Sequence, residues 1–423
     1  MKLTDEEKRI LDGEQGYLAS KCMKFLVAYG EAADAECLVD IDGTVDLHGS
    51  RNPCWTDDFR ITDDEIFEAA RRGEKFKVPT FANKPTPGFI VDGYEQCCTW
   101  PDNDPDYHKK RMDYMKPLIQ MGMVPTLSCN YYLTSTYWPT AGTHCSWGES
   151  SAIPWCNANL GARTNFDGGF QMAYLGKVPC YDLHLDEKRK ATVLCTYVGE
   201  KPLASDMDYD LFGWAAGEKL GNKVPAFINV GKPTLSQFVK MDSSLNTGGQ
   251  VRMYHIPGVT PEAATLKDAF HGEKPQEEIE ITRDDLEKTY HMLNYATDKH
   301  VDMVFLGCPH YNIVEIQKVA RLLEGRRCMA ELWIMTSPGV YDMAVKMGLR
   351  DTIEKTGAKL MSGTCMDELR GQLPPYTVFA MDASKQNYYS TGHLYPRKTQ
   401  CWYGTMEDCI DAALTGYWHG EWR

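Results

Sequence analysis

Val301-Asp302-Met303-Val304-Phe305-Leu306-Gly307 is the stretch that decides the fold class. It is a short apolar run of the kind that forms a buried strand. Cys308-Pro309-His310-Tyr311 follows it, and Asn312 with Glu315 then forms a capping box that predicts a helix start. The pattern recurs downstream, with strands expected at 330–336, 359–363 and 377–381 and a helix entered by Ser337-Pro338. Strands that alternate with helices predict a parallel sheet.

Reactive side chains follow each of these expected strands. Cys308, Ser337, Cys365 and Ser384 all fall where a strand ends. The carboxyl ends of parallel strands share one edge of the sheet, and ligands bind there. We therefore expect a functional site at this edge.

The first half of the chain is less regular. Thr4 with Glu7 and Thr62 with Glu65 are capping boxes that predict helices, the first running in two pieces to Gly30. Strands are expected at 123–129, 177–184, 224–230 and 251–256. An irregular excursion covers 84–110. A boundary near 203–222 would divide the chain into one α/β lobe, 1–210, with the excursion and the block 144–165, and a second α/β lobe, 211–423.

Composition narrows the class of protein. The chain has 423 residues, 43% of them hydrophobic, and a net charge of -14, which argues against binding nucleic acid or anionic lipid by bulk electrostatics. The N-terminus lacks the apolar core of a signal peptide, and no apolar run reaches the roughly 18 residues of a membrane span. The 15 cysteines show no Cys-x-x-Cys pair, so a reducing, cytoplasmic location is expected.

The block 144–165 is the densest in polar groups. It places a histidine, a carboxylate, adjacent hydroxyls, a guanidinium and an amide between glycine and alanine residues. Small spacers let the backbone approach a ligand closely, so this block suits a small oxygen-rich acid. The candidate substrate-binding residues are His144, Ser150, Ser151, Arg163, Thr164 and Asn165.

Three separated cysteines suggest a metal. Cys129, Cys308 and Cys365 each end an apolar segment, and each taken singly is more typical of a buried thiol. Together, three thiolates from different loops suit an iron–sulfur cluster that leaves one iron free for substrate. Zinc with three cysteines and an open position is the alternative.

An open iron fits the dehydration of a hydroxy acid, because it can take the departing hydroxyl while a base removes a proton from the neighbouring carbon. Arg163 and Lys385 could clamp the carboxylate. A surface or interdomain salt bridge is the usual role of such an arginine, but the flanking Gly161 and Asn165 argue against it here. Glu149 is either an acid–base group or the partner of a cation, and His310 is a candidate base or a core histidine. The catalytic candidates are Glu149, His310, Ser384 and Lys385.

The chain resembles the large, catalytic subunit of the aconitase X family over nearly its whole length. The most specific part is Trp147-Gly148-Glu149-Ser150-Ser151-Ala152 with Leu160-Gly161-Ala162-Arg163-Thr164-Asn165. Further matching blocks are Leu3-Thr4-Asp5-Glu6-Glu7, His184-Leu185-Asp186-Glu187, Tyr254-His255, Gly258-Val259-Thr260-Pro261-Glu262-Ala263, Leu306-Gly307-Cys308-Pro309-His310, Thr364-Cys365-Met366 and Tyr403-Gly404-Thr405-Met406-Glu407-Asp408-Cys409.

The resemblance implies an aconitase-like, multi-lobed fold with parallel-sheet α/β/α halves around a central cleft. It implies an iron–sulfur hydro-lyase in which Cys129, Cys308 and Cys365 hold a 3Fe–4S or 4Fe–4S cluster, or else a 2Fe–2S cluster. Family members dehydrate cis-3-hydroxy-L-proline or mevalonate 5-phosphate. They use a small swivelling module that is thought to bring a serine base, and its absence from this sequence implies a separate small subunit.

Departures from the family pattern bear on the substrate. The chain reads Asp42-Gly43-Thr44-Val45-Asp46-Leu47-His48-Gly49 where a small-residue loop is usual, and Met381-Asp382-Ala383-Ser384-Lys385 where a Thr-Asn-Ser-x-Lys element is expected. The stretch 92–111 is also unusual. Cis-3-hydroxy-L-proline is the first substrate expected and mevalonate 5-phosphate the alternative. A non-catalytic or zinc-binding subunit of the same fold is the rival hypothesis.

Overall fold

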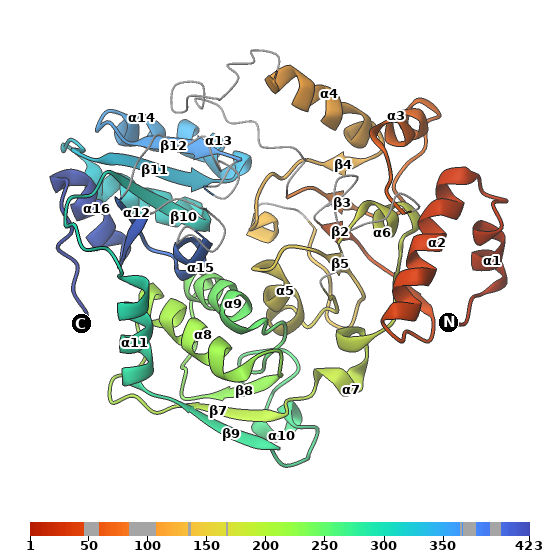
Figure 1. Ribbon diagram of the computed structural model, residues 1–423, viewed down its shortest axis with the longest axis horizontal. Helices are drawn as coiled ribbons and strands as arrows, with labels where there is room; N and C mark the ends of the chain where they lie inside the picture. The colour runs from red at the N-terminus through yellow and green to blue at the C-terminus, as the bar shows by residue number, and fades with distance from the viewer. Residues whose placement is uncertain are drawn as a thin grey trace.

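The structure is a computed structural model that describes residues 1–45, 59–83, 107–133, 137–165, 168–363, 366, 378–389 and 399–423. Within these residues the main strands form three parallel sheets, and a small antiparallel pair joins β1 to β6. Figure 1 shows the three sheets arranged around α5, α9 and α15. No helix in the described part of the chain is long and apolar enough to cross a membrane.

The last third holds a five-stranded parallel sheet in the order β12-β11-β10-β13-β14. The expected strands and helix starts are confirmed, including the Asn312–Glu315 capping box. The elements are β10 (Met303–Tyr311), α12 (Ile313–Leu323), β11 (Glu331–Thr336), α13 (Pro338–Lys346), α14 (Leu349–Glu354), β12 (Lys359–Ser362), β13 (Val378–Met381), α15 (Ser384–Tyr388), β14 (Gln400–Tyr403) and α16 (Met406–Thr415).

The strand order reverses direction at β10. The chain goes from β10 to β11 and β12 on one side, and then returns to β13 and β14 on the other. In an open α/β sheet the ligand crevice lies at such a switch point, outside the carboxyl ends of the strands. The ends of β10 and β13, which carry Cys308 and Asp382, lie at this point.

The middle of the chain forms a smaller parallel sheet in the order β8-β7-β9, covered by two closely packed helices. The expected domain boundary at 210 lies inside the first of these helices, α8, whose apolar side chains are buried and whose glycines lie against α9. The elements are β7 (Val193–Tyr197), α8 (Asp206–Leu220), β8 (Pro225–Ile228), α9 (Leu235–Gly249), α10 (Leu266–Ala269), β9 (Glu277–Ile281) and α11 (Arg283–Leu293).

The first part of the chain contains a parallel sheet in the order β4-β3-β2-β5. Both expected capping boxes are present, at Thr4 and Thr62. The elements are α1 (Asp5–Leu11), α2 (Tyr17–Ala32), β1 (Leu38–Asp40), β2 (Thr44–Val45), α3 (Asp63–Arg71), β3 (Thr80–Phe81), α4 (Tyr107–Gln120), β4 (Met123–Val124), the 3-10 turn η2 (Tyr131–Leu133), β5 (Ser146–Trp147), α5 (Ala152–Pro154), the π-helical turn η3 (Trp155–Asn159), α6 (Phe170–Leu175), β6 (Lys177–Pro179), the 3-10 turn η4 (Asp182–His184) and α7 (Asp186–Arg189).

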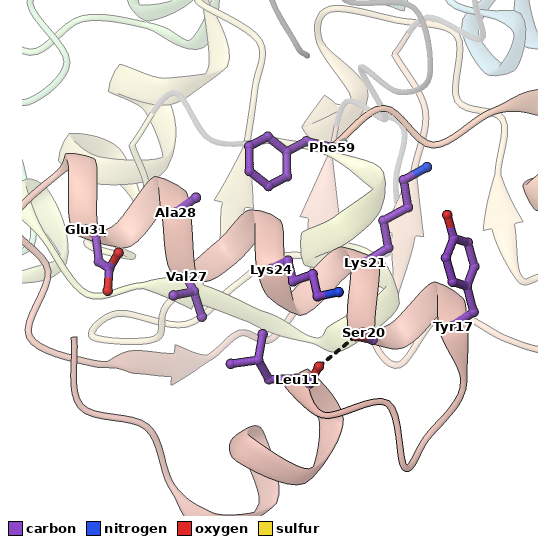
Figure 2. Close-up of a pocket in the computed structure, with 9 residues that line it drawn as sticks. All are labelled: Leu11, Tyr17, Ser20, Lys21, Lys24, Val27, Ala28, Glu31 and Phe59. Carbon is purple, nitrogen blue, oxygen red and sulfur yellow. Dashed lines mark hydrogen bonds between the residues drawn. The ribbon is translucent and has the colours of Figure 1, made fainter. Parts of the chain in front are cut away.

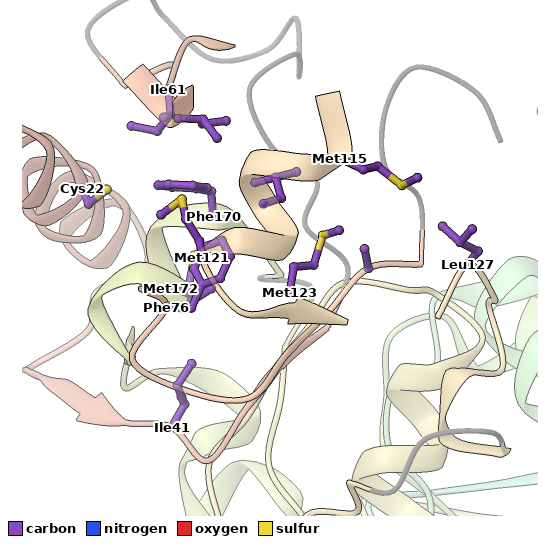
Figure 3. Close-up of a cluster of buried hydrophobic side chains, with 14 of the residues drawn as sticks. Cys22, Ile41, Ile61, Phe76, Met115, Met121, Met123, Leu127, Phe170 and Met172 are labelled. Atoms are coloured by element: carbon purple, nitrogen blue, oxygen red, sulfur yellow. The ribbon is translucent and has the colours of Figure 1, made fainter. Parts of the chain in front are cut away.

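A methionine-rich core holds this part together (Figure 3). Met121, Met123 and Met172 pack with Phe76 and Phe170, and the same cluster of buried side chains extends to Met303, Phe305 and Met381 of the large sheet. Burial of large apolar side chains contributes about 1.5–3 kcal/mol each. The first and last parts of the chain therefore share one core.

Three expected strands differ from the structure. The strand expected at 177–184 ends at Pro179, and Asp182–His184 form the turn η4. The strand expected at 123–129 ends at Val124, because Leu127 turns the chain with a φ of 47° and its N–H bonds to Ala82. The segment 251–256 is no strand: a bridge between Ala226 and His255 is its pairing with the sheet, and its side chains pack on the sheet without forming a ladder. The segments 123–129 and 251–256 are apolar enough to suggest strands, but the periodicity of a sequence does not show where the hydrogen bonds between strands end.

Candidate active site

The end of β10 meets the loop that follows β4. The main-chain N–H of His310 donates to the Sγ of Cys129 (3.3 Å), and the side-chain amide of Asn130 donates to the carbonyl of His310 (2.8 Å). A ring nitrogen of His310 lies 3.1 Å from the Oγ of Ser128. Two main-chain segments 181 residues apart are thus joined, and Cys129 lies beside the Cys308-Pro309-His310 turn.

An ion pair between Glu149 and Lys385 forms the second part of the site. The Nζ of Lys385 lies 3.1 Å from a carboxylate oxygen of Glu149 and donates to the Oγ of Ser150 at 2.8 Å. The hydroxyl of Ser151 donates to the same Glu149 oxygen (3.3 Å), and the amide of Asn83 donates to the other (2.7 Å). The carboxylate is therefore held by donors from several elements.

The two parts are joined through Lys240, whose ammonium donates to the carbonyls of Cys308 and of Asp382, three residues before Lys385, and the charges of both parts act on the pKa of Lys385. Burial by itself would lower this pKa, but the Glu149 carboxylate, followed by Tyr389, Cys308 and Cys129, raises it above its ordinary value. Charges act this strongly only over short distances. The Lys385 ammonium therefore keeps its proton at neutral pH.

The donor set fits a thiolate-bound metal group. Cys129 and Cys308 are partly exposed, unlike the fully buried Cys195 and Cys401. An N–H directed at a cysteine sulfur is a common feature of iron–sulfur sites, where it tunes the cluster. Within the described residues, no group of three or more His, Cys, Asp or Glu side chains forms a ready metal site. The third expected ligand, Cys365, lies outside the described residues.

Ser384 takes a different position from the one expected of a catalytic serine. It is fully buried, and both its N–H and its hydroxyl donate to the carboxylate of Asp210, each at 2.8 Å. The hydroxyl of Tyr403 also donates to Asp210 (2.8 Å). Ser384 therefore anchors the start of α15, one residue before Lys385.

His144 and Arg163 belong to a second group. Nδ1 of His144 lies 3.0 Å from Nδ1 of His184. Arg163 donates to the carbonyl of His184 (2.9 Å) and pairs with Asp186. Burial, followed by the charge of His184, lowers the pKa of His144 to about 4, so His144 is neutral at physiological pH. In this structure Arg163 thus forms the salt bridge that was the alternative to a carboxylate clamp.

Thr164 and Asn165 are fully buried and bonded to main chain. The main-chain N–H of Trp147 donates to the Oγ1 of Thr164 (2.8 Å), and the side-chain amide of Asn165 donates to the carbonyl of Tyr181 (3.1 Å). These contacts fix the strand that carries Ser146 and Trp147 just before Glu149. The expected substrate-binding residues therefore divide into Ser150 and Ser151, beside the ion pair, and a supporting set.

Three site-forming residues were missed by the sequence analysis. Asn83 follows β3 at its carboxyl end, and this placement is a signal that could have found it. Asp210 and Lys240 lie inside helices of the middle region, and Lys240 bonds to Cys308 and Asp382. Buried charges within helices give no sequence signal that separates them from solvent-facing ones.

A cavity of about 580 Å³ lies elsewhere, along α2 (Figure 2). Leu11, Tyr17, Lys21, Lys24 and Phe59 are among the side chains that line it. None of the expected site residues is among them. Size alone thus does not mark the chemical site.

Comparison with known proteins identifies the family. Sequence models of the first, second and third aconitase X domains match residues 1–187, 191–291 and 301–415. The phosphomevalonate dehydratase large subunit of Methanosarcina mazei is 30% identical over 425 residues, with 98% of both chains covered. The cis-3-hydroxy-L-proline dehydratase of Hypocrea jecorina is 31% identical over 309 residues, covering 70% of this chain and 51% of that one.

A solved structure agrees with these matches. The crystal structure of Thermococcus kodakaraensis aconitase X in its holo-form superimposes with a TM-score of 0.79 at 30% identity, covering 98% of this chain and 100% of the other. The predicted α/β fold class is confirmed. The predicted enzyme class, hydro-lyase, is confirmed as well, because the relatives are named dehydratases. The chain belongs to the aconitase X family.

Proposed function

We propose that this chain is the large, cluster-bearing subunit of an iron–sulfur dehydratase that acts on a small hydroxylated carboxylic acid. The observation that carries the proposal is the position of Cys129 and Cys308 next to the Glu149–Lys385 pair. A bound cluster would supply a Lewis-acid iron for the departing hydroxyl. Cys129, Cys308 and, outside the described residues, Cys365 are the proposed ligands, for a 3Fe–4S or 4Fe–4S cluster or, as the alternative, a 2Fe–2S cluster.

The protein side chains would bind and orient the substrate. Lys385 stays protonated, so it is suited to hold a substrate carboxylate and not to act as a base. Glu149 balances this charge in the free protein and, once the substrate carboxylate takes its place beside Lys385, is released to move a proton. Ser150 and Ser151 would stabilise either arrangement by hydrogen bonds. His310 contributes through its main chain, which donates to Cys129.

The base that removes the substrate proton would come from a small subunit of the aconitase X type. The relatives matched over nearly their whole length are named large subunits, which supports a two-subunit enzyme. Ser384, the serine next to Lys385 in the chain, is bonded to Asp210. A cytoplasmic location, a small-molecule substrate and the absence of nucleic-acid or membrane partners are part of this proposal.

Two substrates fit the proposal. Cis-3-hydroxy-L-proline is the substrate expected first. It appears in the names of relatives whose alignments cover 70% of this chain. The observation that favours mevalonate 5-phosphate is the matching chain length. The phosphomevalonate dehydratase large subunit of Methanosarcina mazei aligns over 98% of both chains. In either case the hydroxyl and the proton that form water would leave from adjacent carbons; a bound cluster would supply the Lewis acid for the hydroxyl, and the base would take the proton.

The test is an anaerobic assay of the chain loaded with iron and sulfide, with and without a candidate small subunit, on each substrate. We expect turnover of one substrate only when both subunits are present. A Glu149→Gln variant should retain the cluster and lose at least about 100-fold in kcat, the lower end of the range for one general acid–base group. A colourless chain that binds one zinc and turns over neither substrate would favour the non-catalytic, zinc-binding alternative.

A further inference from the structure

Lys240 is a buried lysine that ties two strand ends together. It lies in α9 with only 4% of its surface exposed. Its ammonium donates to the carbonyl of Cys308 (3.3 Å), to the carbonyl of Asp382 (2.8 Å) and to the Asp382 carboxylate (2.9 Å). The three N–H donors of a lysine ammonium are thus all used on Cys308 of β10 and on Asp382, which directly follows β13.

These acceptors sit at the switch point of the large sheet. Cys308 is a proposed cluster ligand, and Asp382 lies three residues before Lys385. The hydroxyl of Tyr311 also donates to the Asp382 carboxylate (2.5 Å), so Asp382 is held from two sides. A charge so deeply buried is costly unless its partners are fixed, and loss of one partner leaves the other uncompensated.

The middle region also holds the start of α15, just after Asp382, through a second residue. Asp210 of α8 accepts the N–H and the hydroxyl of Ser384, as described above. Figure 1 shows α15 next to α9, between the middle region and the large sheet. The segment 382–385 is therefore held by α8 and α9, and the Lys385 side chain extends from it to Glu149.

We propose that Lys240 is a positioning residue that sets the distance between the cluster ligand Cys308 and the substrate-binding Lys385, without itself touching substrate. This inference rests on the proposed function for what the site does, and on the contacts of Lys240 for how the site is held. A misplacement of about 1 Å in a catalytic group can cost on the order of 100-fold in rate. Loss of Lys240 should therefore lower kcat far more than it changes KM.

The first test uses a charge-balanced variant, because Lys240→Met alone leaves Asp382 buried and uncompensated. Lys240→Met combined with Asp382→Asn removes both charges with little change in volume. The matched control is Lys21→Met with Glu65→Gln, which removes another largely buried pair (2.8 Å) away from the site. We expect the first variant to lose about 100-fold in kcat with KM within about twofold, and the control to keep wild-type kinetics.

A second test is chemical rescue. Lys240 lines a pocket of about 300 Å³ together with Asp206, Lys318 and Thr405, so a small amine has access to it. Propylammonium replaces the atoms that Lys240→Ala removes, and it should restore kcat several-fold in that variant while leaving the wild type unchanged. A lysine needed only for folding would show no such rescue in protein that is already folded.

A third measurement does not depend on the cluster. Hydrogen exchange in the metal-free chain should be faster for the peptide 378–389 in the Lys240→Met/Asp382→Asn variant than in wild type, and unchanged in the control. If the wild type binds no cluster, the proposed function fails, while exchange still decides the role of Lys240. Kinetics and exchange equal to those of the control would overturn the inference.

Discussion

Lys385 carries the positive charge of the candidate site, and Glu149 is its direct counter-charge. The two residues are 236 positions apart, and their side chains are 11% and 9% exposed. A pair this deeply buried gains little net stability over an apolar pair, whereas removal of one partner is strongly destabilising. The pair is therefore consistent with the proposal that Lys385 is a cation held ready for an incoming carboxylate.

The energetics of this pair can be measured. Lys385→Met should lower the free energy of unfolding by about 3 kcal/mol or more, because it leaves the Glu149 carboxylate buried without its cation. Lys385→Met with Glu149→Gln should recover most of that loss and stay inactive. Urea titrations of the metal-free chains measure both values. Equal destabilisation by the single and double variants would contradict a coupled pair.

Cys129 and Cys308 differ from the other thiols in exposure and neighbours. Replacing either with serine should cut iron and sulfide content by more than half after anaerobic loading, because serine oxygen is a poor substitute for thiolate sulfur. The fold should persist, since neither side chain is fully buried. Cys328→Ser is the control, because Cys328 bonds to Thr356, remote from the site. Full iron content in Cys129→Ser would remove Cys129 from the ligand set.

His144 makes the stability of the chain depend on pH. Its pKa falls from an ordinary 6.5 to about 4 in the folded chain, so between these values the unfolded state binds a proton that the folded state does not. Stability should therefore drop as the pH falls from 6.5 to 4. His144→Asn should flatten this part of the stability profile, and His291→Gln, on an exposed helix face, should not. Identical profiles for His144→Asn and wild type would count against the assignment.

At the scale of elements, the sequence predicts the strands of the large sheet and the helix starts well, but not which helices pack against each other. Apolar runs and capping boxes are local signals, so β10 to β13 and the helix starts at Thr4, Thr62 and Asn312 could be predicted. The packing of α8 on α9 depends on glycines that face each other across the interface. Their spacing does not identify their partners.

The close approach of α8 and α9 predicts the effect of one methyl group. A Cβ on Gly249 would lie 1.9 Å from the carbonyl oxygen of Gly217, which is backbone and cannot move aside. The helix propensity gained by alanine, about 1 kcal/mol, is smaller than the cost of overpacking, about 1–3 kcal/mol or more. Gly249→Ala should thus destabilise the chain in thermal or urea melts. Thr247→Ala is the control on the same helix, and a Gly249→Ala variant as stable as wild type would contradict the packing.

At the scale of the whole molecule, each of the three regions contributes to the site. The first supplies Cys129 and Glu149, the middle supplies Asp210 and Lys240, and the last supplies Cys308 and Lys385 with its anchor Ser384. Sequence analysis selected most of the first and last contributions, because they follow strands or lie in a dense polar block. It could not select the middle ones, since their roles come from contacts made only after folding. It gave a salt bridge as the alternative role of Arg163, but could not identify Asp186 as the partner.

The central claim is that the site presents an iron to the substrate beside Lys385. Mössbauer spectroscopy of the chain loaded anaerobically with ⁵⁷Fe, recorded without and with each candidate substrate, tests it most directly. The account predicts iron–sulfur signals in which one iron changes its isomer shift and quadrupole splitting when the correct substrate is added, and no change in Lys385→Met/Glu149→Gln. Spectra without cluster signals, or cluster spectra that neither substrate alters, would contradict it.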